Sequence, residues 1–489
     1  MVKRFPAAVL AAATVGAALC VPTAAAAHTP RTPPLAWHDC HTADTPPSLE
    51  CATLTVPLDW SDPDGPTIEL AVNRLPARDP AHRIGPLLVN PGGPGGSGTE
   101  VVAYGGMLLG APELATVRDR FDLIGFDPRG VGGSTPVTCT DPVYDPAAPT
   151  FPSTPDGYAA MVDSSHRHGT DCARSTGPLL GHVDTISAAR DVEAVRVGLG
   201  APKISWLGVS YGTELGSFYA DLYPDRVRAM VLDGAVDHSR LMAQAAVEES
   251  AATEREFHRF ADWCDDSTDC ALHGTDVLAG LDALTARADR GEIHDATLGR
   301  TVSGAEITSG SYSYLTLRDA WPGLSSALAA AEKTPSEPEQ LDAGIVGVAP
   351  IYPAYRAVSC QDFAPALHGL ADLRTRAAAV RAAAPHSWRY SEMWDMTTGC
   401  AGWPVPAANP PHAQHVSGVD TVLVVGNRYD PATPYRWAQA LAGHIDGSRL
   451  LTVDGDGHTG LENNACAREK EAGYLVTGKA PAPDTVCAS

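Results

Sequence analysis

The stretch I-S-W-L-G-V-S-Y-G-T-E-L-G-S-F-Y-A-D-L-Y-P, residues 204–224, changes its structural character at Ser210. After the serine, residues 211–223 place apolar side chains at helical spacing and end at a proline. Gly208 and Gly212 stand two residues to either side of the serine. The residues before it predict a short buried strand through four apolar side chains, Ile204, Trp206, Leu207 and Val209. The stretch therefore predicts a sharp strand-to-helix turn centred on Ser210.

A serine at such a turn is typical of a nucleophile. Neighbouring backbone presses on the turn from both sides, and glycines two residues away remove the side chains that would clash with it. The turn would lift Ser210 Oγ out of the sheet and aim the Tyr211 amide and the helix N-terminus at a substrate oxygen. The G-x-S-x-G pattern alone occurs often by chance, so its place between a strand and a helix carries the prediction. An ordinary glycine-rich turn is the alternative.

Strands and helices alternate on both sides of this turn, which predicts an α/β fold with a mostly parallel sheet. Buried strands are expected at 86–90, 121–126, 227–232, 419–425 and 449–453, and an amphipathic helix at 184–200. Between them lies a block of about 180 residues, 239–417, which is far too long for a loop. Three helical segments are expected within it, at Leu241–Trp263, Asp276–Arg290 and Leu370–Ala383. We interpret this block as a helical cap inserted into a core made of residues 28–238 and 418–489.

Residues 1–27 have the pattern of an export signal. Lys3 and Arg4 precede an apolar run too short to span a bilayer, and small residues follow up to Ala27. A lipid anchor on Cys20 is disfavoured because Leu19 stands where such sites carry a small residue. No later segment of the sequence is long and apolar enough to cross a membrane, so the mature chain is expected to be secreted and soluble.

The cysteines agree with export. Cys20 would leave with the signal, and the ten that follow form an even set, which predicts disulfides in an exported chain. Pairing each cysteine with its sequence neighbour is the simplest arrangement, most clearly for Cys40 with Cys51 and Cys264 with Cys270. Metal binding by the cysteines is the alternative, but the sequence has no C-x-x-C pair.

The formal charge of −23 limits the partners of this chain. An acidic surface repels nucleic acid and anionic membranes, so neither is expected as a partner of the mature form. It mildly favours cationic ligands such as the free amine of a peptide. The charge carries no information about the fold.

A serine needs a base and an acid that orients the base before it can act as a nucleophile. His458 follows the strand expected at 449–453 on a glycine-flanked loop, and we predict that it is the base. Asp430 ends the preceding strand and is the predicted acid, although an aspartate before Pro431 is also typical of a helix cap. Asp454 and Asp456 are the alternatives. The order Ser210, Asp430, His458 is the one that this fold requires.

The developing negative charge on the substrate would need two amides aimed at it. One is expected from Tyr211, and the other from the loop N-P-G-G-P-G-G-S-G, residues 90–98, where we choose Gly93. The same loop matches a dinucleotide fingerprint at Gly93, Gly95 and Gly98, but its prolines make the turn rigid and an exported chain does not meet nicotinamide cofactors. No lysine follows the glycines, which excludes a Walker loop. No cofactor and no metal site are expected.

Taken together, these motifs resemble the α/β-hydrolase fold, and more closely the proline-iminopeptidase-like serine peptidases, which include the secreted tripeptidyl aminopeptidases of actinobacteria. The resemblance covers nearly all of the chain after the signal. It rests on W-H-D-C (37–40), L-E-C-A-T-L-T-V-P-L-D-W (49–60), N-P-G-G-P-G-G-S-G (90–98), F-D-P-R-G-V-G-G-S (126–134), G-V-S-Y-G-T (208–213), D-P-A-T-P (430–434) and G-D-G-H-T-G (455–460).

The resemblance implies Ser210 as nucleophile, Asp430 as acid and His458 as base, with the amides of Gly93 and Tyr211 as oxyanion donors. It also implies a helical cap that closes over the N-terminus of a peptide. Two functions follow: a serine exopeptidase that releases short peptides, tripeptides in particular, from free N-termini, or a carboxylesterase with the same triad. A non-catalytic binder is disfavoured, because all three triad positions hold competent residues.

An aminopeptidase must also recognise a free amine, usually through carboxylates of the cap. The sequence offers five candidates without distinguishing between them: Glu248, Glu249, Asp265, Asp266 and Asp362. Asp127 and Arg129 are expected to brace the loop beside the site.

Overall fold

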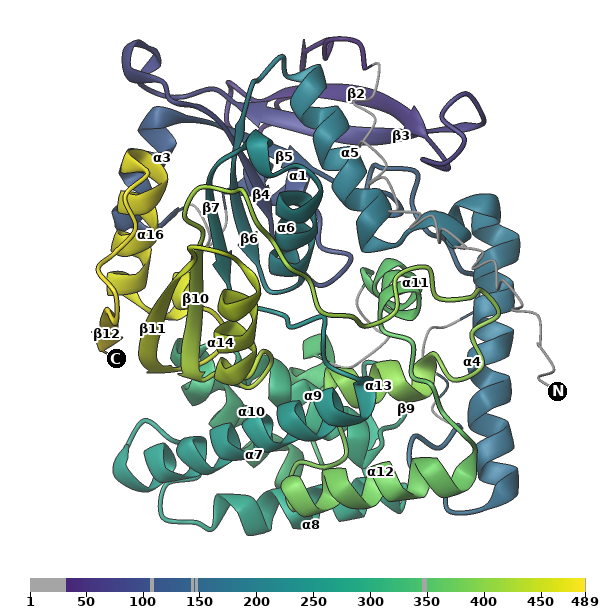
Figure 1. Ribbon diagram of the computed structural model, residues 1–489. Helices are drawn as coiled ribbons and strands as arrows, with labels where there is room; N and C mark the ends of the chain where they lie inside the picture. The colour runs from purple at the N-terminus through teal and green to yellow at the C-terminus, as the bar shows by residue number, and fades with distance from the viewer. Residues whose placement is uncertain (1–31, 106–109, 142–144, 146–147, 345–349, 489) are drawn as a thin grey trace, which may run out of the picture.

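The computed structural model describes residues 32–105, 110–141, 145, 148–344 and 350–488, so the predicted export signal and Cys20 lie outside the described residues. A large sheet runs through the upper part of the molecule, helices cover both of its faces, and a separate group of helices lies below one end of the sheet (Figure 1).

The sheet has the order β1-β2-β3-β5-β4-β6-β7-β10-β11-β12. From β5 to β12 each neighbouring pair is parallel, and β1, β2 and β3 add an antiparallel edge. The α/β fold with a mostly parallel sheet is therefore confirmed. The strands are β1 (His38–Asp39), β2 (Glu50–Pro57), β3 (Thr67–Leu75), β4 (Gly85–Asn90), β5 (Phe121–Phe126), β6 (Ile204–Val209), β7 (Val227–Asp233), β10 (Leu423–Tyr429), β11 (Arg449–Asp456) and β12 (Val486–Ala488).

Helices pack on both faces because the central strands are apolar on both sides. The strands β4, β5 and β6 are buried along their whole length, as a parallel sheet covered on both faces requires. One apolar cluster joins the sheet to α5 (Thr185–Gly198), α6 (Tyr211–Leu222) and α14 (Tyr435–His444). A second cluster joins the opposite face to α1 (Gly98–Tyr104), α3 (Ala115–Arg120) and α16 (Ala465–Thr477).

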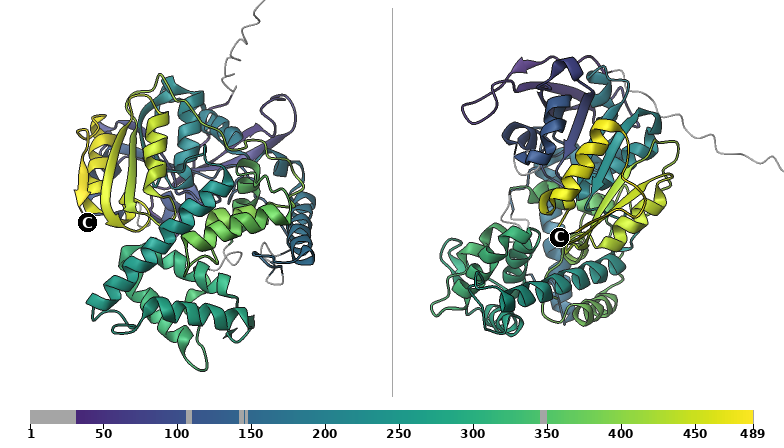
Figure 2. Two further views of the ribbon diagram at one scale, coloured as in Figure 1. Left: turned by 60° about the horizontal axis from the view of Figure 1, so that its bottom comes forward. Right: turned by 90° about the vertical axis from the view of Figure 1, so that its left-hand side faces the viewer.

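The helices between β7 and β10 are here called the cap helices, and most of them form the group below the sheet, whereas α11 packs against the apolar cluster of the sheet. Both views in Figure 2 show this group gathered at one end of the sheet, away from most of the strands. The three predicted helical segments are confirmed, with ends that differ by at most three residues. The cap helices are α7 (Met242–Asp266), α8 (Val277–Asp289), α9 (Gly304–Leu315), α10 (Trp321–Glu332), α11 (Tyr352–Asp362), α12 (Leu370–Ala383) and α13 (Glu392–Gly399).

The structure contains elements that the sequence analysis did not list, and one expected strand has other bounds. The strand expected at 419–425 is β10, which starts at Leu423 because pairing with β7 begins there, at Val231. The helix α4 (Pro155–Thr176) was not expected, and it packs beside the cap helices, where Ser165 Oγ donates to the carbonyl of Gly399 at 2.6 Å.

Five disulfides join the ten cysteines of the described residues. Each cysteine pairs with its sequence neighbour, as predicted: Cys40–Cys51, Cys139–Cys172, Cys264–Cys270, Cys360–Cys400 and Cys466–Cys487. Among the described helices, none combines the length and the apolar character needed to span a membrane.

Candidate active site

Ser210 stands between the last residue of β6 and the first residue of α6, with φ = 57° and ψ = −125°. A positive φ is uncommon for a residue other than glycine and costs on the order of 1–3 kcal/mol, so the surroundings must hold it. The Ser210 amide donates to the carbonyl of Asp233 at 2.8 Å, and the Thr213 amide and hydroxyl both donate to the carbonyl of Ser210. The turn is thus fixed from the sheet on one side and from the helix on the other.

The glycines around the serine allow three pieces of backbone to meet. A Cβ on Gly208 would overlap the carbonyl of Gly212, and a Cβ on Gly212 would lie 2.6 Å from the carbonyl of Asn90 at the end of β4. A Cβ on Gly92 would lie 2.9 Å from Ser210 Cβ. The predicted steric reason for the two flanking glycines is confirmed, and Gly92 is a third residue with the same role.

The structure brings His458 to Asp430. His458 Nδ1 lies 2.9 Å from Asp430 Oδ2 and 3.1 Å from Oδ1, and the carboxylate is fully buried. Asp430 Oδ1 also accepts from the amides of Ala432 and Thr433, each at 2.8 Å, so the aspartate caps the following turn as well. Asp430 was expected either to contact the histidine or to cap the following turn, and in the structure it does both.

The two alternative aspartates point elsewhere. Asp454 is half-exposed and lies 3.5 Å from Arg428, while Asp456 pairs with Arg259 and lies 3.5 Å from Arg318. Among the described residues, neither carboxylate forms a hydrogen bond or an ion pair with His458.

The loop that carries His458 is held from the sheet and from the cap. The amides of Gly460 and Leu461 donate to the two carboxylate oxygens of Asp233, at 3.0 and 2.7 Å. From the cap side, Thr316, just beyond α9, accepts from the His458 amide at 2.7 Å. The position of the imidazole therefore depends on both parts of the molecule.

Ser210 and His458 line one cavity of about 220 Å³. Among the described residues no hydrogen bond joins Ser210 Oγ to His458 Nε2, and Nε2 is buried without a partner. Such contacts often tighten only when substrate binds. The other lining residues are Pro91, Gly93, Val209, Tyr312, Thr316, Glu392, Ala432 and Glu462.

The amides of Tyr211 and Gly93 were predicted to bind a substrate oxygen, and of these two residues Gly93 lines the cavity. Neither the Tyr211 amide, which opens α6, nor the Gly93 amide donates to another group of the described chain. The first amides of a helix have no acceptor within the helix, and the helix dipole favours negative charge at that end. The arrangement is suited to an oxyanion bound above Ser210.

Acidic side chains around the cavity raise the pKa of His458. Burial lowers the pKa of His458, but the nearby charges of Asp430, Glu462 and Glu392 raise it by more, to about 9. Burial raises the pKa of Glu392 to about 7, against the opposing effect of His458, and burial likewise raises the pKa of Glu462. A positively charged group entering the cavity would therefore meet two carboxylates.

The five acidic residues considered for amine binding lie outside this cavity. Glu249 is buried and accepts from the amides of Glu392 and Met393, so it caps α13. Glu248 accepts hydrogen bonds from Arg436 and Trp437. Asp362 is buried and accepts hydrogen bonds from Thr185 and Asn409. Asp265 and Asp266 are exposed to solvent. The carboxylates that do line the cavity, Glu392 and Glu462, were missed, because only the packing of α13 and α15 (Gly460–Asn463) brings them there.

Asp127 and Arg129, which were predicted to brace the glycine-rich loop, have different hydrogen-bond partners. Asp127 accepts from the Ser97 hydroxyl at 2.7 Å and from Thr99 and Gly133, so it ties the end of the glycine-rich loop to the next turn. Arg129 instead pairs with Asp191 of α5 at 2.7 Å, and its hydrogen bonds within the described chain go to residues outside that loop.

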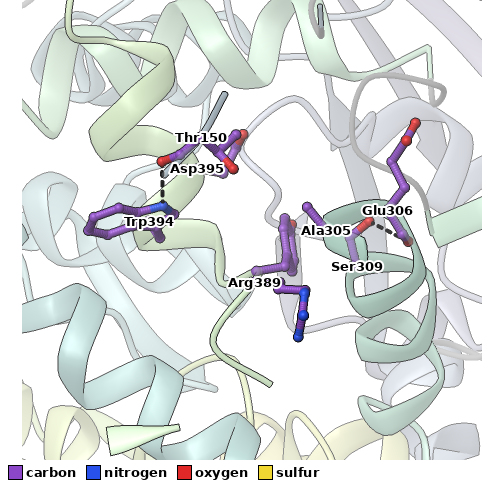
Figure 3. Close-up of a pocket in the computed structure, with 8 residues that line it drawn as sticks. Thr150, Ala305, Glu306, Ser309, Arg389, Trp394 and Asp395 are labelled. Carbon is purple, nitrogen blue, oxygen red and sulfur yellow. Dashed lines mark hydrogen bonds between the residues drawn. The ribbon is translucent and has the colours of Figure 1, made fainter. Parts of the chain in front are cut away.

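A second pocket lies behind the cavity, and Figure 3 shows it between α9 and the segment that leads into α13. Its wall includes Tyr390, whose ring packs against Tyr312 of the cavity with 5.5 Å between ring centroids. On the side of the pocket opposite α9, Trp394 Nε1 donates to the carbonyl of Thr150 at 3.1 Å (Figure 3). Tyr312 and Tyr390 together form a wall between the two hollows.

The chain matches known families and proteins over most of its length. Residues 85–279 match the family model described as the alpha/beta hydrolase fold, and residues 385–487 match the one described as TAP-like protein. The chain is 33% identical to a tripeptidyl aminopeptidase of Streptomyces lividans, over 92% of this chain and 86% of that protein. It is 32% identical to the serine protease Hip1 of Mycobacterium tuberculosis, over 93% and 91%. It is 35% identical to carboxylesterase B of the same organism, over 93% and 90%.

Proposed function

Because the chain belongs to the α/β-hydrolase family, we propose that it is an exported serine exopeptidase that removes tripeptides from free N-termini. One observation carries the proposal: Ser210 and the His458–Asp430 pair meet at a cavity whose remaining charged groups are carboxylates. Such a cavity suits a substrate that brings a positive charge into the same cavity as the reacting carbonyl, as the free N-terminus of a peptide does.

The reaction begins at Ser210. His458 Nε2 removes the hydroxyl proton while Oγ attacks the peptide carbonyl, and the Asp430 carboxylate stabilises the imidazolium that forms. The amides of Tyr211 and Gly93 donate to the oxyanion of the tetrahedral intermediate. His458 then gives the proton to the leaving amine, and an acyl-enzyme remains.

Water completes the cycle. His458 takes a proton from a water molecule, which attacks the acyl carbonyl, and Ser210 regains its proton as the short peptide leaves. Asp430 accepts from two backbone amides as well as from His458, so its carboxylate is fixed and the imidazole keeps the tautomer with Nε2 free.

Recognition of the free amine falls to the cap side of the cavity. Glu392 opens α13, and its own amide is held by Glu249 at 2.9 Å, so its place is fixed. An ammonium group beside it would favour the ionised carboxyl and lower its raised pKa. The packed rings of Tyr312 and Tyr390 close the cavity behind Glu392. They limit how many residues of the substrate fit on the N-terminal side of the cleaved bond.

Two of the relatives support a peptidase, since they are named a tripeptidyl aminopeptidase and a serine protease. The release of three residues per cycle rests on the first of these names. The third relative, carboxylesterase B, supports the alternative function of an exported carboxylesterase with the same triad.

One comparison separates the two functions. Turnover would be measured for a tripeptidyl anilide with a free amine, for its N-blocked form and for a p-nitrophenyl ester. We expect strong preference for the free-amine anilide, and Glu392→Gln should remove most of that preference. Glu469→Gln, an exposed position on α16, is the matched control. Equal cleavage of the free and blocked anilides, with faster turnover of the ester, would favour the carboxylesterase.

Export is part of the proposal. The sequence pattern of residues 1–27 and the five disulfides of the described chain both support it. Mass spectrometry of protein recovered from the culture medium would test it, with a mature N-terminus expected near Ala27.

A further inference from the structure

We propose that the cap carries a zinc site formed by Glu254 and His258 of α7 and by His386 of the segment after α12. One ligand atom of each residue lies within 4.8 Å of the other two. The sequence analysis expected no metal, and no spacing motif reveals this site, because 132 residues separate Glu254 from His386.

The two ligands on α7 face the same side of the helix. Residues four apart on a helix are neighbours, and His258 Nε2 lies 3.6 Å from Glu254 Oε1. Ligand atoms of a tetrahedral zinc ion at ordinary bond lengths of about 2.0–2.2 Å stand about as far apart as this. The pair therefore needs little rearrangement to bind one ion.

The third ligand is already oriented. His386 Nδ1 lies 2.9 Å from Asp282 Oδ2 of α8, which leaves Nε2 as the nitrogen with a free lone pair. A carboxylate behind a histidine is the usual support of a zinc-binding imidazole, because it fixes the tautomer and strengthens the ligand. The rings of His258 and His386 stand nearly perpendicular, with 5.7 Å between centroids.

The carboxylate ligand is fixed as well. Glu254 Oε2 accepts from the amide and the hydroxyl of Ser387, at 2.9 and 2.6 Å, and the side chain is only 6% exposed. His258 is 51% exposed, which gives an ion a path from solvent and leaves room for water as the fourth ligand. Two imidazoles and one carboxylate are a donor set typical of zinc.

The other cluster of metal-binding residue types among the described residues does not qualify. It consists of Cys139, His168 and Cys172, and the two sulfurs are joined in a disulfide, so no thiolate is available.

An ion at this site would fasten two parts of the cap. It would join α7 to the start of the segment that leads through Tyr390 to α13, and Asp282 would connect α8 to the same point. The ion would stabilise the cap and would not take part in the reaction, because none of its ligands lines the catalytic cavity.

The test is zinc binding by the whole mature chain after treatment with a chelator. Titration against a chromophoric chelator should give one tight site, and Co²⁺ in its place should give the visible bands of a tetrahedral complex. His258→Ala and His386→Ala should each weaken binding by at least about 100-fold, and Asp282→Asn by about 10–100-fold, the usual cost of an outer-shell partner. Zinc should raise the melting temperature of the wild type and leave that of His258→Ala unchanged.

His415→Ala is the control, since this exposed histidine lies 3.9 Å from Asp446 and belongs to no metal-binding cluster among the described residues, so its removal should not alter binding. Two results would overturn the proposal. One is a wild-type chain that binds zinc no more tightly than His258→Ala does. The other is tight binding that persists in both histidine variants and inhibits turnover, which would put the ion at His458 instead.

Discussion

Glu256 of the cap helix α7 accepts a hydrogen bond from the amide of Gly457, the residue before His458, at 2.9 Å. The cap thus touches the backbone of the loop that carries the proposed base. Burial, with Asp456 nearby, raises the pKa of Glu256 well above its ordinary value, which favours a neutral carboxyl. Through this contact the cap helices help to hold the loop that carries His458.

Removal of this contact should slow the reaction. We expect Glu256→Ala to lower kcat by about 10–100-fold with a smaller change in KM, because a small displacement of a catalytic group costs that much. Glu256→Gln keeps an acceptor oxygen and resembles the neutral carboxyl, so it should stay within a few-fold of the wild type. Steady-state kinetics of the three proteins decide the matter, and equal activity of the alanine variant would show that the contact is dispensable.

The choice of acid is tested by two conservative changes. Asp430→Asn removes the charge that stabilises the imidazolium and alters the tautomer of His458, and kcat should fall by about 10³–10⁴-fold. Asp454→Asn, at a half-exposed position that faces Arg428, should leave kcat nearly unchanged. A large loss in Asp454→Asn together with a small one in Asp430→Asn would reverse the assignment.

The acidic cavity makes a prediction about pH. His458 must be neutral to act as a base, and its pKa is raised to about 9, so kcat/KM for an ester without an amine should rise with pH towards that value. Glu462→Gln removes a negative charge that stabilises the imidazolium, and the acid limb of the profile should therefore move to lower pH. Glu469→Gln should leave the profile in place, and an unmoved limb in Glu462→Gln would contradict the electrostatic argument.

The same imidazole links stability to pH. Its pKa is about 6.5 in an unfolded chain and about 9 in the folded one, so the stabilisation from its proton is complete below pH ~6.5 and is lost as pH rises through 9. We expect the melting temperature to fall over this range, and to fall less in His458→Ala. Parallel melting curves of the two proteins across the range measure the difference.

Glycine 212 offers a structural test. In Gly212→Ala the new methyl group would press on the backbone of Asn90, and we expect a loss of about 1–3 kcal/mol in the free energy of unfolding, with a larger loss of activity. Gly443→Ala, within α14, meets no atom within 4 Å and should be neutral or stabilising by up to about 1 kcal/mol. Denaturant unfolding of both variants provides the measurement.

The two disulfides of the cap should contribute different amounts to the stability of the protein. Cys360–Cys400 closes a loop with a sequence separation of 40, and Cys264–Cys270 one of only 6. A disulfide restricts the unfolded chain more when it closes a longer loop. Replacement of the first pair by two serines should therefore lower the free energy of unfolding by about 4 kcal/mol, and replacement of the second by about 2 kcal/mol. Unfolding of the two double variants checks the order, which the reverse result would contradict.

The features that depend on short segments of the chain could be predicted from the sequence. The strand before Ser210, the glycines beside it and the helix after it are all visible within twenty residues, and the structure has the same turn. Asp430 and His458 were identified because each follows a strand, and parallel strands bring their carboxyl ends to one edge of the sheet. The disulfides followed from neighbour pairing for a similar reason, since each joins segments close in the chain.

What the sequence did not reveal depends on packing between distant segments. The buried face of α4 consists mostly of polar or small residues such as Ser165, His168 and Asp171, so it lacks the apolar periodicity that identifies a helix. Glu392 has an ordinary place in the sequence, and only the docking of α13 against α7 brings it to the cavity. The ligands of the proposed zinc site are likewise far apart in the chain.

The pairing of β7 with β10 has a consequence for how this protein can diverge. The chain leaves the sheet after Asp233 and returns at Leu423 beside the strand that it left, so the long excursion between them begins and ends at adjacent positions. Duplications, deletions or exchanges within that excursion can accumulate during evolution without shifting the register of the ten-stranded sheet. Selection can therefore reshape the excursion while the sheet keeps its pairing, provided that Glu256 and Thr316 still hold the loop that carries His458.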